Sequence, residues 1–238
     1  MAAARSLLVF GSTGRCGPCV LRSALAQGWT VTAFVRSPAR VPEDLQGRVT
    51  VHVGDLNDAA AVTAAVRAAA PHGVVDASSA LPVGQPKGTQ PNNADRGVLL
   101  KAVAKSLEEE GRLDECVLLV VGGQLVPEPG GPIHSWGVAA LACCLRLAVG
   151  KAWREMQASL DWMWSGAPPS FRFVYARMGY MVEGPSRGTL EAQTTDKNIQ
   201  HGSVSYCDVA DALVRLAGDS TRAWERKALF FNYSAAVK

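Results

Sequence analysis

Three glycines near the N-terminus constrain the fold more than any other feature of the sequence. They lie in segment 11–17, GSTGRCG, which follows the apolar segment 6–10 and precedes a stretch with a helical pattern. A glycine-rich turn between a strand and a helix turns the chain sharply, brings the backbone close to a pyrophosphate and packs the helix against the strand. The free N–H groups at the helix start then face the phosphates. The segment therefore predicts a dinucleotide site, against the alternative of an ordinary strand-to-helix turn that contains three glycines.

The rest of the chain alternates between apolar, β-branched runs and longer helical patterns. We expect strands at 6–10, 30–35, 49–53, 73–77, 116–121, 171–176 and 228–232, and helices at 14–27, 58–69, 93–110, 136–164 and 208–216. Such alternation is typical of a doubly wound parallel sheet with helices on both faces. We therefore predict one Rossmann-type α/β domain over residues 1–238, with about seven strands. Segment 179–204 does not fit the alternation and is a candidate small C-terminal cap on the substrate side.

Charge and composition exclude several classes of partner. The net charge of +3, from 24 basic and 21 acidic residues, is too small to indicate nucleic-acid or membrane binding. The longest apolar stretch, 137–150, is interrupted by Arg146 and is shorter than the roughly 20 residues of a membrane helix. The six cysteines do not have the density of a secreted disulfide scaffold, and no set of side chains has metal-ligand spacing. We expect a cytoplasmic monomer or homodimer that binds a small-molecule acceptor and no metal.

The end of the second expected strand indicates which dinucleotide is bound. An NAD site usually has an acidic residue there, which accepts a hydrogen bond from the adenosine ribose. This sequence has Arg36 and Arg40 instead, and a guanidinium group suits a 2′-phosphate. A hydroxyl of Ser12 or Thr13 and the side chain of Arg15 are further candidates for the same phosphate or the adenine. The prediction is NADP(H); the alternative is that both arginines are solvated surface charges.

Four motifs resemble the atypical and extended short-chain dehydrogenase/reductase families. They are GxxGxxG at 11–17, VRSPAR at 35–40, GDL at 54–56 and SYCDVA at 205–210. The chain is similar to the compact NAD(P)H-binding group that includes flavin reductase (biliverdin-IXβ reductase) and NmrA-like regulators. The resemblance implies that Asp55 and Leu56 lie at the adenine, although Asp55 has an alternative role as a helix N-cap, and that residues 77–80 lie beside the nicotinamide ribose. The residues expected at the cofactor are Gly11, Ser12, Thr13, Gly14, Arg15, Cys16, Gly17, Arg36, Arg40, Asp55, Leu56, Ala77, Ser78, Ser79 and Lys151.

The proton donor of the resembled families is missing. Those enzymes use Tyr-x-x-x-Lys on the helix after the fifth strand; Lys151 fits the lysine, but Leu147 stands where the tyrosine would be. The usual Ser or Thr after the fifth strand is replaced by GGQ at 122–124. The catalytic candidates are therefore Lys151, Gln124 and Tyr175, each with an ordinary structural alternative. Other polar side chains considered near the pocket are His134, Tyr180 and Tyr206.

These observations support two functions. The first is an NADPH-dependent oxidoreductase of the atypical short-chain type, with hydride transfer to a conjugated acceptor: a flavin, a quinone or a tetrapyrrole-like molecule. Such acceptors do not need a dedicated tyrosine, because their own chemistry or a water molecule handles the proton. The second is a non-catalytic NADP(H)-sensing regulatory protein, which needs the same glycine segment and also lacks the tyrosine.

The sequence CGPC at 16–19 allows a further interpretation. It is the redox motif of thioredoxins and stands at the start of an expected helix, where a thiolate is favoured. Against a dithiol function, Gly17 is already explained as the third glycine of the nucleotide turn, and the chain lacks the thioredoxin order of elements. The neighbouring cysteines 143 and 144 lie in an apolar segment and are expected to pack in the core.

Overall fold

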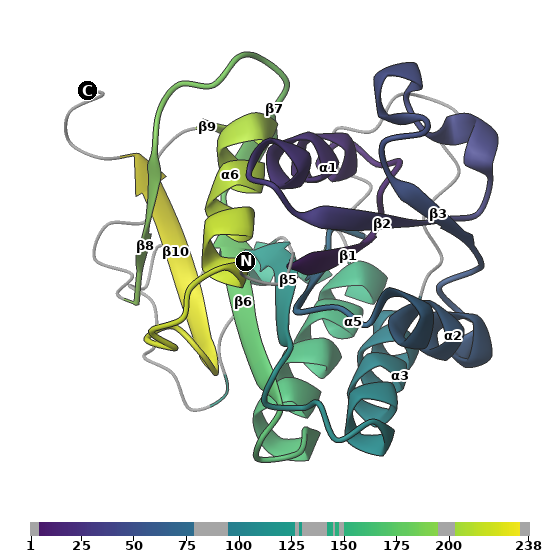
Figure 1. The fold of residues 1–238 in the computed structure, drawn as a ribbon. Coiled ribbons are helices and arrows are strands. Elements are labelled where there is room, and N and C mark those ends of the chain that lie inside the picture. Colours follow the sequence, from purple (N-terminus) through teal and green to yellow (C-terminus); the bar gives the residue numbers. More distant parts are fainter. Residues whose placement is uncertain are drawn as a thin grey trace.

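A sheet of eight strands, in the order β3-β2-β1-β4-β5-β6-β10-β8, forms the centre of the protein (Figure 1). The computed structural model describes residues 5–78, 95–126, 129, 142–144, 146–147, 150–194 and 203–233. The strands of this sheet are Ser6–Phe10 (β1), Thr30–Val35 (β2), Thr50–Val53 (β3), Gly73–Asp76 (β4), Val117–Gly123 (β5), Arg172–Met178 (β6), Leu190–Gln193 (β8) and Lys227–Tyr233 (β10). Neighbouring strands pair in parallel, except that β8 pairs antiparallel with β10. The Rossmann-type α/β fold is confirmed, and β8 makes the sheet one strand larger than expected.

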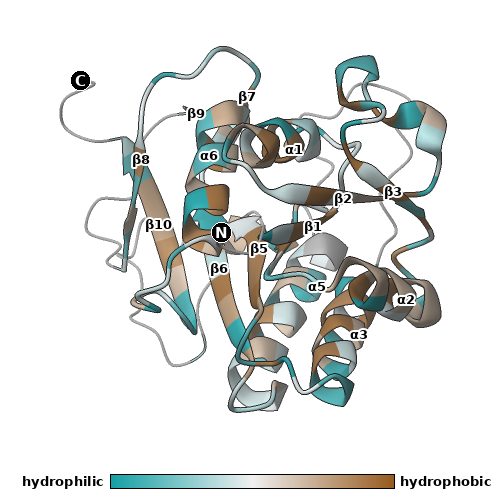
Figure 2. Cartoon of the chain, viewed as in Figure 1, coloured by the Kyte–Doolittle hydropathy of each residue, from teal (hydrophilic) through white to brown (hydrophobic). Residues whose placement is uncertain are grey.

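Helices cover both faces of the sheet. Gly17–Ala26 (α1) and Tyr206–Ala217 (α6) pack on one face, and Ala59–Ala69 (α2), Arg96–Glu109 (α3) and Gly150–Asp161 (α5) pack on the other (Figure 1). Alternate residues of each central strand face the two helical layers. In β1, Leu7 and Val9 pack toward α1 and α6, whereas Leu8 and Phe10 pack toward α2, α3 and α5. Figure 2 shows the resulting apolar centre, which agrees with the continuous hydrophobic runs of a parallel sheet buried on both sides.

Local chemistry explains where the helices begin and end. The first helix starts at Gly17 rather than at residue 14, because the residues before it form the turn that leaves β1. Asp58 is the N-cap of α2, and its carboxylate accepts hydrogen bonds from the N–H groups of Ala60 and Ala61 at 2.9 and 3.2 Å. Gly111 follows α3 with a φ of +67°, as expected of a C-terminal glycine. Of the expected helix 136–164, residues 136–141 lie outside the described part, and α5 continues into a wider π-helical turn at Trp162–Gly166.

Segment 179–204 contributes to two sheets. Tyr180–Val182 (β7) pairs in parallel with Ser203–Ser205 (β9), and β8 forms the edge of the main sheet. The buried carboxylate of Asp208 holds part of this segment: it accepts hydrogen bonds from Ser186 Oγ at 2.5 Å, Arg187 N at 2.9 Å and Tyr233 Oη at 2.7 Å. The SYCDVA motif is therefore a capping and anchoring device at the start of α6. Residues 195–202 lie outside the described part, so a cap on the substrate side stays a prediction.

The described residues bear on the expected absence of a membrane helix and on the expected packing of Cys143 and Cys144. None of the helices in these ranges has the length and hydropathy that crossing a bilayer requires. Cys143 and Cys144 are exposed, so the expectation that they pack in the core was wrong.

Candidate dinucleotide-binding site

The order of the strands reverses between β1 and β4. From β1 the chain builds outward through β2 to β3, and it then returns to the other side of β1 to form β4. Open α/β sheets bind ligands in the crevice at such a reversal, at the carboxyl ends of the strands. The glycine segment follows directly after β1, and Ala77 and Ser78 follow directly after β4, so the fold brings both to the same crevice.

Backbone contacts explain two of the three glycines. Gly11 has a φ of +72°, and a Cβ atom there would lie 2.6 Å from the nitrogen of Ser78 and 2.7 Å from the carbonyl carbon of Ala77. At Gly17 a Cβ atom would overlap the carbonyl oxygen of Gly11. Gly11 therefore allows the ends of β1 and β4 to approach each other, and Gly17 allows α1 to start close against the turn.

The third glycine has a different environment. Gly14 is exposed, and a Cβ atom there would meet a single atom within 4 Å, the carbonyl oxygen of Gly11 at 3.2 Å. This single contact is tight, but the fold restricts Gly14 less than it restricts Gly11 and Gly17. The space outside Gly14, next to the start of α1, fits the approach of a pyrophosphate to the backbone.

The other side chains of the segment divide into buried and exposed ones. Ser12 is buried, and its hydroxyl donates to the carbonyl oxygen of Val9 at 2.5 Å. Cys16 is buried in the core, and this burial raises the pKa of its thiol to about 12. Thr13 is half-buried and Arg15 is exposed. The expected contacts of Thr13 and Arg15 with the cofactor stay predictions, and the buried side chains of Ser12 and Cys16 leave their backbone as the part that can contact a ligand.

Two exposed arginines follow β2. Arg36 directly follows β2, and Arg40 is the last residue of the short 3₁₀ turn Pro38–Arg40, where its N–H donates to the Ser37 carbonyl oxygen at 3.1 Å. Within the described residues, neither guanidinium forms an ion pair with a carboxylate. Nearby, Asp44 is bound by Arg22 through two hydrogen bonds of 2.7 and 2.8 Å, and this arginine lowers the pKa of the Asp44 carboxyl. Asp44 therefore has a cationic partner other than Arg36 and Arg40.

The GDL motif lies at the end of β3. A Cβ atom at Gly54 would lie 2.5 Å from the ring of Phe34, so the glycine makes room for this aromatic side chain. Asp55 is exposed and accepts a hydrogen bond from the N–H of Asn57 at 2.8 Å. Leu56 is partly buried against the core. Asp55 closes a local turn, and the N-cap of α2 is Asp58. The expected contact of Asp55 with the adenine stays a prediction.

A buried ion pair that we did not expect from the sequence fixes the turn after β4. The Asp76 carboxylate is fully buried and lies 2.8 Å from Nε of Arg96, which is also buried. Asp76 also accepts hydrogen bonds from the N–H of Ser78, at 2.9 Å, and from its hydroxyl, and Arg96 donates to the Ser78 carbonyl oxygen. This network holds the backbone that Gly11 contacts, at the position expected beside the nicotinamide ribose. Ser79 lies outside the described residues.

Of the catalytic candidates, Tyr175 lies within β6 and Gln124 directly follows β5. Tyr175 is fully buried, and its ring lies against Gly122, where a Cβ atom would overlap the hydroxyl group. Burial raises the pKa of this phenol. Gln124 is half-buried, and its N–H donates to the Met178 carbonyl oxygen at 3.1 Å. Lys151 belongs to the first turn of α5, but its side chain is outside the described part.

The two described tyrosines among the remaining candidates have different surroundings. Tyr180, on β7, has an exposed fraction of 63%, and Tyr206 packs in the core at the start of α6. His134 is outside the described residues. Leu147 has an exposed fraction of 81%. Among the residues that the structure describes, no group of three or more His, Cys, Asp and Glu side chains has the geometry to hold a metal ion.

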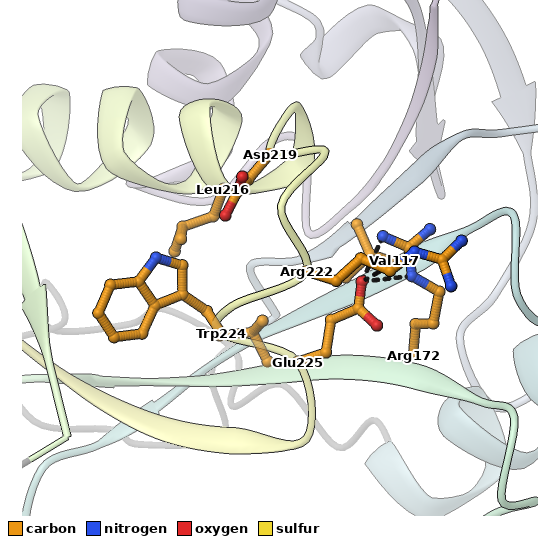
Figure 3. A pocket seen from close by; sticks show the side chains of 8 residues that line it. Val117, Arg172, Leu216, Asp219, Arg222, Trp224 and Glu225 are labelled. Carbon is orange, nitrogen blue, oxygen red and sulfur yellow. Dashed lines mark hydrogen bonds and ion pairs between the residues drawn. The ribbon is translucent and has the colours of Figure 1, made fainter.

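A small hollow lies at the amino ends of the strands, whereas the crevice is at their carboxyl ends (Figure 3). Its lining includes Val117 and Arg172, the first residues of β5 and β6, and Arg172 Nε donates to Glu225 at 2.6 Å. Arg172 and Arg222 each donate to the carbonyl oxygen of Asp114 at 3.0 Å. These charges are paired with one another and are far from the crevice between β1 and β4, so the hollow is part of the packing.

The family described as NAD(P)H-binding matches residues 11–220. The chain belongs to this family. The match begins at Gly11, directly after β1, and includes the carboxyl ends of β2 to β6. Binding of a nicotinamide dinucleotide is thereby shown as a property of the family, without a choice between NAD and NADP. No curated protein matches the sequence.

Solved structures share this fold over nearly the whole chain. ChuY, an anaerobillin reductase from Escherichia coli O157:H7, has 22% identity and a TM-score of 0.70, with 98% of each chain covered. A short-chain dehydrogenase/reductase from Veillonella parvula DSM 2008, solved in complex with NADP, has 15% identity and a TM-score of 0.68, with 98% of this chain and 97% of that chain covered. The oxidoreductase ylbE from Lactococcus lactis has 16% identity and a TM-score of 0.65, covering 96% and 90%. At these identities the likeness concerns the fold.

Proposed function

We propose that the protein is an NADPH-dependent oxidoreductase that reduces a conjugated acceptor such as a flavin, a quinone or a tetrapyrrole-like molecule. The observation that carries the cofactor assignment is the pair Arg36 and Arg40, exposed at the end of β2 without carboxylate partners among the described residues. A planar guanidinium binds a phosphate through two parallel hydrogen bonds. The complex of one structural neighbour with NADP is consistent with this choice.

The chain's own residues bind and orient the reactants. NADPH, when bound, supplies a hydride ion from its nicotinamide ring. Gly14 and the N–H groups at the start of α1 would receive the pyrophosphate, and the Asp76–Arg96 network keeps the turn at Ala77 and Ser78 in one position against Gly11. A fixed cofactor holds the reacting atoms at a defined distance from an acceptor, which is the main source of rate acceleration in a site without a dedicated proton donor.

The kind of acceptor follows from the position of the tyrosines. Leu147 replaces the tyrosine of the resembled families, and the hydroxyl of Tyr175 is covered by Gly122. A carbonyl substrate would therefore lack its usual proton donor, whereas a conjugated acceptor can receive the proton from water. The neighbour named an anaerobillin reductase favours a reductase of this general kind.

A second candidate function is a non-catalytic NADP(H) sensor. The presence of Leu147 at the position of the usual tyrosine supports this function, since a sensor needs a cofactor-binding site but no proton donor. Steady-state assays with NADPH and a free flavin or quinone separate the two functions. Turnover above the rate without protein supports the reductase; micromolar binding of NADPH without turnover of any acceptor class supports the sensor.

We expect the protein to bind NADPH more tightly than NADH. Hydrogen bonds to charged groups contribute about 1.5–3 kcal/mol each, so two partly exposed contacts should favour NADPH by roughly 2–3 kcal/mol. That corresponds to a preference on the order of 30- to 150-fold at about 1.4 kcal/mol per decade. Added salt should reduce it, because exposed phosphate–arginine attraction is screened. Calorimetric titration of both cofactors measures the preference.

Arg36→Ala should weaken NADPH binding and leave NADH binding nearly unchanged. The matched control is Arg222→Ala, which removes an exposed arginine at the amino ends of the strands and should alter neither affinity. Equal affinities of the wild-type protein for NADPH and NADH would refute the assignment of the 2′-phosphate site.

No single tyrosine should act as the proton donor of the reductase. We expect Tyr175→Phe, Tyr180→Phe and Tyr206→Phe each to lower the turnover number by no more than about tenfold, below the 10²–10⁴-fold typical of a lost general acid. The reason is their placement: Tyr175 and Tyr206 are buried and Tyr180 is on β7. A thousandfold loss in any of these variants, with cofactor affinity unchanged, would identify a proton donor and contradict this expectation.

A further inference from the structure

Helices α1 and α6 lie side by side on one face of the sheet (Figure 1). The Sγ atoms of Cys19 and Cys207 are 3.5 Å apart. Four residues further along both helices, Ser23 Oγ donates to Asp211 Oδ1 at 2.5 Å. Equal steps along the two helices show that they run in the same direction. The polar pair one turn away therefore holds the two thiols opposite each other.

The two thiols differ from the other cysteine of the CGPC motif. Cys16 is buried in the core, whereas Cys19 and Cys207 are both partly exposed. A disulfide requires the sulfur atoms to approach to about 2.05 Å, a movement that rotation of the side chains can supply when the thiols already touch. The partner that the fold gives to Cys19 is thus Cys207 of the SYCDVA motif.

We propose that Cys19 and Cys207 form a reversible oxidative modification site, at which a low-molecular-weight disulfide cross-links α1 to α6. In the first step the Cys207 thiolate attacks one sulfur of the oxidant; the bond between Cys207 and that sulfur forms, the oxidant's S–S bond breaks, and the released half takes up a proton as a thiol. In the second step Cys19 loses its proton and attacks the Cys207 sulfur, which expels the other half as a second thiol. Two protein thiols are oxidised, and one small disulfide is reduced to two thiols.

The order of the steps follows from the surroundings of Cys19. Burial, followed by the hydrogen bond and the charge interaction with Cys207, raises the pKa of the Cys19 thiol to about 12. A raised pKa leaves little of the thiolate, which is the attacking species, and so disfavours Cys19 as the first nucleophile. Once the Cys207 sulfur is part of the mixed disulfide, its hydrogen bond and charge no longer raise the pKa of Cys19. Cys19 is then the resolving thiol, with its target already in contact.

Peptide mapping of the oxidised protein tests this proposal. The native protein is treated with oxidised glutathione, remaining thiols are alkylated in denaturant, and the chain is digested with trypsin. Cys19 falls in peptide 16–22, CGPCVLR, and Cys207 in peptide 198–215. We expect these two peptides as one cross-linked species, with the alkyl group on Cys16, and its loss after reduction with dithiothreitol.

Variants distinguish this link from other oxidation. Cys207→Ser should abolish the cross-link, and Cys143→Ser, which alters an exposed cysteine elsewhere, should retain it. A peptide 16–22 that is lighter by two hydrogens would show a link between Cys16 and Cys19 and overturn the proposal. Recovery of both peptides fully alkylated from the wild-type protein, or of Cys207 linked to any other cysteine, would also overturn it. The readout does not involve NADPH, so it is independent of the proposed function.

Discussion

Replacing Gly14 with valine should abolish dinucleotide binding while the domain stays folded. Gly14 is exposed, and a Cβ atom there would meet only the Gly11 carbonyl oxygen, at 3.2 Å, so the loss of unfolding free energy should be about 1 kcal/mol or less. The branched side chain would instead occupy the space that a pyrophosphate needs. Loss of two hydrogen bonds from backbone N–H groups to the phosphates, at about 1.5–3 kcal/mol each, would weaken binding by roughly 3–6 kcal/mol. That is on the order of 10²- to 10⁴-fold, measurable by calorimetric or fluorescence titration with NADPH.

Gly17→Val is the matched control, because it places the same side chain in the same turn. There a Cβ atom would overlap the Gly11 carbonyl oxygen and lie 2.6 Å from the carbonyl carbon of Ser12, so the helix start has to move. We expect this variant to lose stability as well as binding, as measured by urea unfolding. If Gly14→Val binds NADPH as tightly as the wild-type protein, the assignment of segment 11–17 to the pyrophosphate is wrong.

The fold could be predicted from the sequence because the strands are buried on both faces. Runs such as LLVF in β1 and VLLVV in β5 are apolar throughout, and the stretches between them have helical periodicity. The strand of the main sheet that was missed, β8, has the short and partly polar sequence LEAQ. It pairs only with β10 at the edge of the sheet, so only one side of its backbone is fixed by a neighbour and its sequence carries little signal.

The candidate site could be predicted where it depends on local backbone geometry. The glycine spacing and the arginines after β2 are features of short segments, and they follow the carboxyl ends of the neighbouring parallel strands β1 and β2. Contacts between distant segments gave no such signal. Arg96 begins a helix and has the sequence appearance of an ordinary solvated residue, and Cys207 stands 188 positions from Cys19. The one available hint was Asp76, a carboxylate that ends the otherwise apolar strand GVVD and therefore needed a buried partner.

Arg96→Met should destabilise the protein by about 3–5 kcal/mol, the range found when one partner of a buried ion pair is removed. Methionine keeps much of the apolar volume of the arginine, but the fully buried Asp76 carboxylate loses its cation and the Ser78 carbonyl oxygen loses a donor. The same change loosens the turn that Gly11 contacts, so NADPH affinity should also fall. Urea unfolding monitored by circular dichroism gives the change in stability, and titration of the folded variant gives the change in affinity.

Two further variants show whether the loss of stability in Arg96→Met comes from the uncompensated charge of Asp76. Arg67→Met removes an arginine with an exposed fraction of 55%, paired with Glu109, and should change stability by at most about 1 kcal/mol. Adding Asp76→Asn to Arg96→Met removes the buried charge but keeps a side-chain oxygen for the Ser78 N–H, so the double variant should recover a large part of the loss. If Arg96→Met is no less stable than Arg67→Met, the ion pair does not hold the turn after β4. If the double variant is as unstable as the single one, packing of the arginine rather than its charge stabilises this part of the crevice.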